Sequence, residues 1–170
     1  MRRVVSLALI ATLAGCGYRP LGHGEISGLP TTVKTIAIGT LKNRTLRPTI
    51  QPALKDELIR RFRADARIQL ANEGAADTLL EGAIEGFGEV PLAFDRGSDT
   101  ARRVRVEISF SFTVTDRANQ TVLLREGVSG VAYALFAAGV APTRVAEDEA
   151  TDRAIADLAE RVVMRVLDGI

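Results

Sequence analysis

An unbroken alternation of apolar and polar side chains between Val104 and Thr115 constrains the fold of this chain more than any other feature. Every second residue is valine, isoleucine or phenylalanine, and the residues between them are arginine, glutamate, serine or threonine. Since successive side chains of a strand point to opposite faces, the pattern predicts a strand with one buried and one solvated face. Such strands are typical of antiparallel sheets that are covered on one side only.

Four other segments have sequences typical of strands. β-Branched residues predict a first strand over 32–39, and we expect 66–71 to form a short edge strand. A longer strand is expected over 78–90. The polar residues 116–120 predict a turn that returns the chain as a hairpin strand over 121–133.

The strand expected over 78–90 has glycine on one face and glutamate on the other. Gly82 shares its face with buried positions, and glycine weakens a strand unless another element approaches closely, so we expect a helix crossing or a strong twist there. Three glutamates are expected to line the opposite face: Glu81, Glu85 and Glu89. Carboxylates at this spacing more often decorate a solvated face than catalyse a reaction, so we assign them no catalytic role.

Two segments have the periodicity of amphipathic helices. Thr49 is expected to cap the first, whose apolar residues lie four apart: Ile50, Leu54, Leu58 and Phe62. A second helix is expected from about Arg144 to Leu167, with an apolar stripe opposite charged residues. Because both helices need cover from the same sheet, we predict an α+β fold. It is a two-layer sandwich of two helices packed on one face of a mostly antiparallel sheet of four to five strands, forming one domain over 32–170.

The first residues have the organisation of a lipoprotein signal peptide. Two arginines precede an uncharged apolar run over 4–14, which is too short to span a bilayer as a helix. The run ends in Leu-Ala-Gly-Cys, which resembles the bacterial lipobox, where the thiol of the cysteine, here Cys16, accepts a diacylglycerol group before cleavage. We therefore expect a signal peptide over 1–15, followed by a lipidated N-terminus and flexible tether over 16–31.

The residue after the lipidated cysteine bears on the compartment. It is Gly17, and not the aspartate that resembles an inner-membrane retention signal. Several acyl chains give stable membrane anchoring where a single chain would be marginal. We expect a lipid-anchored protein on the periplasmic side of the outer membrane.

Cysteine and histidine are too few for several kinds of active site. Cys16 is the single cysteine, and His23, in the tether, is the single histidine. A disulfide, a zinc cluster of Cys and His, and a triad built on histidine are therefore not expected. The formal net charge of +1 does not favour binding to nucleic acid. We expect no enzymatic activity, no metal and no cofactor.

A group of arginines around position 100 is the candidate binding site. Its members are Arg96, Arg102, Arg103 and Arg105. Guanidinium groups bind phosphates or carboxylates with two parallel hydrogen bonds, so such a cluster suits an anionic ligand. The alternative is an edge strand that charge keeps soluble.

Several short segments, in order along nearly all of the mature chain, resemble the LptE family of lipopolysaccharide-assembly lipoproteins. They are the lipobox with Gly17-Tyr18, Ile36-Ala37-Ile38, Asn43 to Pro48, Leu54 to Phe62, Ala76-Asp77 with Glu81-Gly82, and Val162 to Gly169. The resemblance implies two helices on a sheet of about four strands. It also implies a lipoprotein that plugs the β-barrel partner LptD, helps that barrel to assemble and binds lipopolysaccharide. The four arginines are our candidates for the lipopolysaccharide phosphates because of their charge and placement, and not because of the resemblance.

A second family remains open as an alternative. Regulatory lipoproteins that resemble the LpoB-type activators of penicillin-binding proteins also begin with a strand like Ile36-Ala37-Ile38, an asparagine turn and a helix. A large barrel that co-purifies with the chain supports the first reading, and a soluble enzyme domain supports the second.

The lipobox generates the first testable prediction. Changing Cys16→Ser removes the thiol that accepts the lipid, so the protein should remain uncleaved or become soluble in the periplasm. Membrane fractionation and the mass of the mature N-terminus measure this. An unchanged membrane fraction without loss of acyl mass would reject the anchor.

Overall fold

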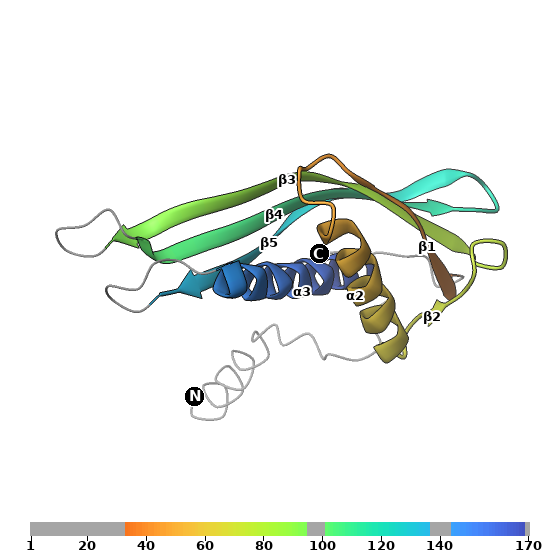
Figure 1. The fold of residues 1–170 in the computed structure, drawn as a ribbon. Helices are drawn as coiled ribbons and strands as arrows, with labels where there is room; N and C mark the ends of the chain where they lie inside the picture. Colours follow the sequence, from red (N-terminus) through yellow and green to blue (C-terminus); the bar gives the residue numbers. More distant parts are fainter. Residues whose placement is uncertain (1–32, 95–100, 137–143, 169–170) are drawn as a thin grey trace, which may run out of the picture.

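The chain folds into an arched sheet that covers two helices on one face (Figure 1). The computed structural model describes residues 33–94, 101–136 and 144–168, and at positions 101 and 102 it describes the backbone alone. Its elements are β1 (Thr35–Asn43), α2 (Ile50–Ala64), β2 (Gln69–Leu70), β3 (Thr78–Phe94), β4 (Ala101–Asp116), β5 (Thr121–Leu135) and α3 (Arg144–Asp168). The predicted two-layer α+β sandwich is confirmed.

The sheet is mixed, with five strands in the order β2-β1-β3-β4-β5. The strands β3, β4 and β5 form an antiparallel meander, whereas β1 runs parallel to both β2 and β3. A parallel neighbour requires a crossover connection, and α2 provides it between β1 and β2. The parallel half is therefore the half that the first helix covers.

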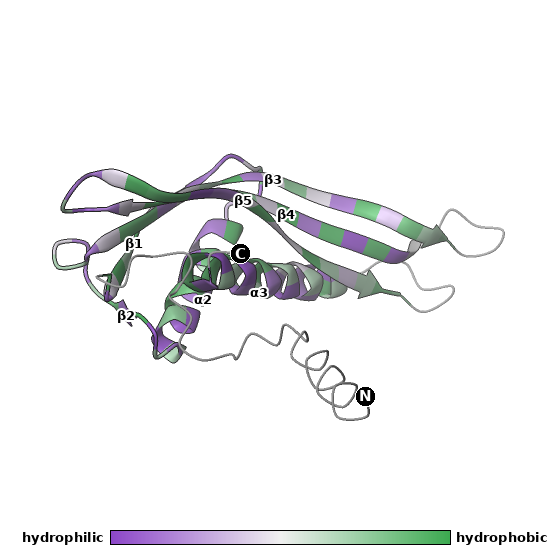
Figure 2. Ribbon diagram, turned by 180° about the vertical axis from the view of Figure 1, so that it is seen from behind, coloured by the Kyte–Doolittle hydropathy of each residue, from purple (hydrophilic) through white to green (hydrophobic). Residues whose placement is uncertain are grey.

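The alternation in β4 sets the position of the core. Its apolar residues, from Val104 to Val114, are all buried against the helices, and Phe110 and Phe112 stack with ring centroids 6.0 Å apart. On α2 the four residues at fourfold spacing are buried, as predicted. Figure 2 shows the alternating colours of apolar and polar residues along the long strands. One face of the sheet therefore meets both helices, and the polar residues of β4 lie on the opposite face.

Two glycines allow close approaches inside this core. At Gly82 a Cβ atom would lie 2.4 Å from the ring of Phe110, so the ring of the neighbouring strand occupies the space in place of the expected helix. At Gly130 on β5 a Cβ atom would lie 2.2 Å from the carbonyl oxygen of Ala154 and 2.5 Å from Cβ of Leu158, both on α3. Gly130 is therefore where the terminal helix contacts the backbone of the sheet.

Side-chain hydrogen bonds fix both ends of β1. At its start, Oδ2 of Asp77 accepts from the amides of Lys34 (3.0 Å) and Thr35 (2.9 Å). These bonds, with the bond from Lys34 as the largest cause, lower the pKa of Asp77. At the end of β1, Oδ1 of Asn43 accepts from the amide of Thr45 at 2.9 Å, which forms a tight polar turn.

The helix start differs from the prediction that Thr49 caps α2. Thr49 already has helical backbone angles (φ −71°, ψ −22°), and its side chain makes no capping hydrogen bond. The asparagine turn just before the helix already fixes the path of the chain, because Nδ2 of Asn43 donates to the carbonyl of Arg47 at 2.8 Å.

The close approach at Gly130 predicts a large and local effect of a single methyl group. Gly130→Ala should lower the free energy of unfolding by roughly 1–3 kcal/mol, because α3 must move away from β5. Gly127→Ala on the same strand is the matched control, since nothing lies within 4 Å of the position of its Cβ. Denaturant unfolding of both variants measures the difference, and equal stabilities would refute this account of the helix contact.

Candidate functional site

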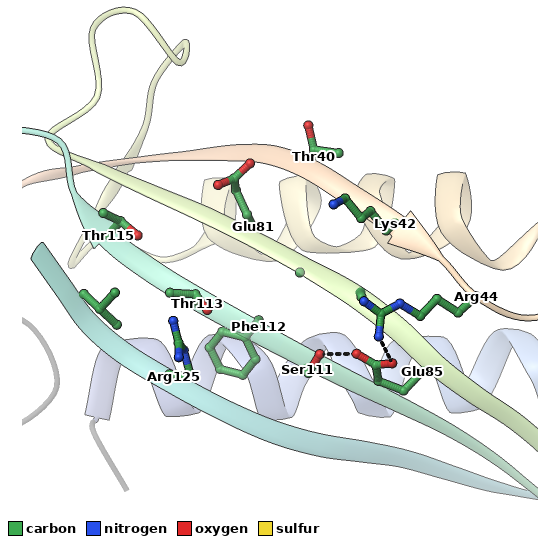
Figure 3. A pocket seen from close by; sticks show the side chains of 13 residues that line it. Thr40, Lys42, Arg44, Glu81, Glu85, Ser111, Phe112, Thr113, Thr115 and Arg125 are labelled. Atoms are coloured by element: carbon green, nitrogen blue, oxygen red, sulfur yellow. Dashed lines mark hydrogen bonds and ion pairs between the residues drawn. The ribbon is translucent and has the colours of Figure 1, made fainter. Parts of the chain in front are cut away.

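The face of the sheet that turns away from the helices holds a polar groove of about 490 Å³. It spans strands β1, β3, β4 and β5, and Figure 3 shows its side chains. The charged and hydroxyl-bearing residues of its lining are Thr40, Lys42, Arg44, Glu81, Glu85, Ser111, Thr113, Thr115 and Arg125. The residues that β4 gives to the groove alternate with its buried apolar positions, so the same alternation that builds the core also builds this part of the groove.

Glu85 is the centre of a hydrogen-bond network in this groove (Figure 3). Its Oε1 accepts from the hydroxyl of Ser111 at 2.6 Å, and its Oε2 accepts from the guanidinium of Arg44 at 2.8 Å. The hydroxyl of Ser111 is the largest cause that lowers the pKa of Glu85, and Arg44 acts in the same direction. The carboxylate is therefore held ionised and oriented, and it links β3 to β4 and to the loop that follows β1.

An irregularity in β3 separates the three glutamates that we expected on one face. The register of β3 on β4 shifts between Ile84 and Gly86, which makes Glu85 an extra residue in the strand. Beyond this bulge Glu89 pairs with the buried Val106, so it lies on the helix side of the sheet. The prediction of a shared face is therefore wrong for Glu89, whereas Glu81 and Glu85 do line the same groove.

Glu89 instead belongs to a contact between β3 and the loop after β1. It accepts from Arg47 at 2.9 Å, and the guanidinium of Arg47 lies 4.5 Å from the ring centroid of Phe87. The tip of this loop is Leu46, which is fully exposed. The ion pair of Arg44 with Glu85 on the outer face and that of Arg47 with Glu89 on the helix side therefore hold the loop against β3.

The candidate arginines lie farther along β4 from the groove. Arg103 and Arg105 are two residues apart and therefore share the outer face. The guanidinium of Arg103 lies 4.3 Å from the ring centroid of Tyr133, and Arg105 donates to Glu107 at 2.6 Å. The buried Nε of Arg105 has no hydrogen-bond partner among the described residues.

The remaining candidates have no described side chain. Arg96 lies outside the described residues, and Arg102 is placed on β4 by its backbone alone. The alternative of a charged edge strand is wrong for these positions, because β4 lies between β3 and β5. After the turn, β5 pairs with β4 on the side opposite to β3. Because of this pairing, β4 is an interior strand and not an edge strand.

Apolar side chains are exposed near Arg103 and Arg105. They are Val90, Leu92, Phe94, Tyr133 and Leu135, at the ends of β3 and β5 that pair with the first half of β4. A surface that has cationic groups next to apolar groups is suited to bind an amphiphilic ligand that carries negative charge. The described residues hold no group of three or more His, Cys, Asp or Glu that could hold a metal ion.

Three cations of the groove were not among the candidates from the sequence: Lys42, Arg44 and Arg125. In the sequence, Arg44 belongs only to the segment Asn43 to Pro48 that carries the resemblance, and Lys42 and Arg125 belong to none of the segments that carry it. Their meeting depends on the parallel register of β1 on β3 and on the antiparallel register of β5 on β4. The strand alternation places Lys42 and Arg125 on the outer face, and Arg44 follows the end of β1, but no local pattern signals that the three share a groove.

Comparisons with known proteins show the family of the chain. The model of the LptE family, described as lipopolysaccharide-assembly, matches residues 33–166. A search of curated proteins gives no significant match. In the part of the chain that the structure describes, no helix is long and apolar enough to cross a membrane.

Solved structures share the fold at low sequence identity. A protein from Xanthomonas campestris has a TM-score of 0.60 and 13% identity, with 82% of this chain and 88% of that chain covered. A minor lipoprotein from Acinetobacter baumannii has a TM-score of 0.53 and 12% identity, over 81% of this chain and 94% of that chain. An uncharacterized lipoprotein B from Nitrosomonas europaea has a TM-score of 0.53 and 14% identity, over 89% of this chain and 88% of that chain.

The family model covers most of the domain, from the residues just before β1 to the last turns of α3. The segments that carry the resemblance coincide with structural features of the fold. These are the asparagine turn after β1, the buried face of α2, the hydrogen bonds of Asp77 to the start of β1, and the C-terminal part of α3. The chain belongs to the LptE family of lipopolysaccharide-assembly proteins.

Proposed function

We propose that this protein is an outer-membrane lipoprotein, anchored through Cys16, whose domain occupies the lumen of an LptD-like β-barrel. There it assists assembly of the barrel and the insertion of lipopolysaccharide. Family membership supports a role in lipopolysaccharide assembly, and the lipobox of the sequence supports the anchor. The finer assignment to the barrel rests on the character of the outer face of the sheet.

The polar outer face is the observation that carries this proposal. Large β-barrels have wet and polar interiors, so a domain that fills one must present polar surfaces to the wall. Here the outer face of β4 is a row of hydroxyl and charged side chains from Arg103 to Thr115. Small residues on the same face, such as Ala83, Ser109 and Gly127, allow a neighbouring surface to approach closely.

The same domain is proposed to contact lipopolysaccharide near Arg103 and Arg105. Lipopolysaccharide has phosphates next to acyl chains, and this part of the outer surface has guanidinium groups next to exposed apolar side chains. The side chain of Arg105 is 39% exposed, and the terminal N–H groups that Glu107 leaves free can donate to an anionic ligand. Arg96 and Arg102 belong to the same proposal because of their charge and their proximity in sequence.

The regulatory lipoprotein alternative has less support. The family match extends over both helices and all strands of the domain, whereas that alternative rests on an opening strand and turn that several envelope families share.

Co-purification tests the partnership with the barrel. A tagged chain extracted from outer membranes in detergent should retain a large β-barrel protein. Ser109→Arg, which places a long cation on the outer face, should reduce that retention. Ala64→Arg at the exposed end of α2 is the matched control. Absence of any barrel from the wild-type preparation would overturn the partnership.

Binding measurements test the proposed lipopolysaccharide contact. Changing Arg103→Gln and Arg105→Gln together should weaken lipopolysaccharide binding about tenfold or more, since charge-assisted hydrogen bonds to charged groups contribute roughly 1.5–3 kcal/mol when desolvated. Arg60→Gln with Arg63→Gln, on the exposed side of α2, removes the same charge from the other layer. Equal binding by both double variants would show that the contribution of this domain is structural.

A further inference from the structure

The two edges of the sheet are very different in length. The edge strand β2 has 2 residues, whereas β5 at the other edge has 15. An edge strand presents backbone amides and carbonyls that can pair with another chain, and proteins usually cover or interrupt such an edge. The exposed edge of β5 should therefore be covered by another part of this protein or by a partner.

Helix α3 protects one part of this edge. Oδ2 of Asp157 accepts from the amide of Val131 at 2.9 Å, and Arg153 donates to the carbonyl of Tyr133 at 3.0 Å. These two bonds show that the backbone groups of Val131 and Tyr133 point away from β4. Both outward positions are thus occupied by side chains of the same protein.

The alternation of an antiparallel ladder identifies the other outward positions. The register between β4 and β5 is regular from Val114 paired with Leu124 to Arg103 paired with Leu135. Every second residue in this stretch therefore points its backbone groups outward, which includes Arg125, Gly127 and Ser129. Within the described part of the chain, no hydrogen bond engages these outward amides and carbonyls.

Arginines of α3 border the open segment. Arg165 lies 3.5 Å from Glu126 on β5, and Arg161 donates to the same carboxylate oxygen of Asp157 that accepts from Val131. Their side chains are 44% and 51% exposed, and each guanidinium has five N–H donors, most of which these contacts leave free. Each arginine already has one carboxylate partner, and the N–H donors that remain free can donate hydrogen bonds to a carboxylate of another chain.

The same arginines argue against a second copy of this chain as the occupant. Pairing of two β5 edges would bring together the two α3 helices, and with them the arginines that border each edge. Like charges at such a contact are unfavourable.

We propose that the edge of β5 from Arg125 to Ser129 accepts an extended segment of a partner protein as an added strand. Carboxylate side chains of that segment lie toward Arg161 and Arg165. Backbone hydrogen bonds provide the affinity, and the two arginines provide the preference for acidic sequence. The added strand ends before Val131, because Asp157 occupies the amide of that residue.

Gly127→Pro is the sharpest variant for this proposal. The amide of Gly127 points outward, so proline at this position removes no hydrogen bond to β4 and is tolerated at a sheet edge. Open space surrounds its Cβ position. The ring nevertheless removes the central donor and obstructs the approach of another strand. Gly127→Ala adds a Cβ but keeps the amide, and is therefore the matched control.

The experiment uses the full-length lipidated protein in detergent micelles and two synthetic peptides of about ten residues, the length of a long strand. One peptide alternates valine with glutamate, and the other replaces glutamate by lysine. The acidic peptide should slow hydrogen exchange at the amides of Arg125, Gly127 and Ser129 by at least about tenfold, the expected sign of a newly formed backbone hydrogen bond. The lysine peptide should bind more weakly, and Val131 should show no added protection.

The variants decide between outcomes. Gly127→Pro should abolish the added protection and Gly127→Ala should retain it, while the amides of Val128 and Gly130 report that the ladder with β4 is intact. If the proline variant does not fold, Arg161→Gln with Arg165→Gln decides, because it should abolish the preference for the acidic peptide. An acidic peptide that does not bind, that protects other residues, or whose preference survives the arginine changes would overturn the proposal.

Discussion

The one-sided burial of β4 is the constraint on which the rest of this structure depends. Its inward residues are buried under the helix layer, in which α3 packs on β4 and β5 and α2 packs on β1 and β2, and its two neighbours β3 and β5 are long strands. Because the apolar set of a strand can face only one side, the helices must lie together on that side. The opposite face is then left uncovered along its whole length, and this is where the candidate site lies.

Close packing on the helix side imposes glycine at two positions. Gly82 makes room for the ring of Phe110, and Gly130 makes room for the backbone of α3. The contact at Gly82 lies within the sheet, whereas the contact at Gly130 draws the two layers together and brings Asp157 and Arg153 within reach of the β5 edge. The packing of the core and the protection of the edge are therefore produced by the same helix contact.

The outer face combines a rigid polar network with small side chains. Glu85 is the extra residue of the bulge, and it links β3 to β4 through Ser111 and to the loop after β1 through Arg44. The groove is suited to contact with another polar surface, whereas exposed apolar side chains lie at the end of the face that holds Arg103 and Arg105. This physical character fits a domain that works inside a partner, as we propose for this member of the LptE family.

The sequence alone determined the elements and the layers, because hydrophobic periodicity is a local property that follows from the pleat of a strand and the turn of a helix. The alternation in β4 and the fourfold spacing in α2 therefore predicted the fold class and most of the buried residues. Thr49 was misjudged because the asparagine turn had already fixed the chain. The tertiary structure decided the face of Glu89, the interior position of β4 and the groove around Glu85. Each of these depends on register and strand order, which are set by contacts between residues far apart in the chain and leave no local signal in the sequence.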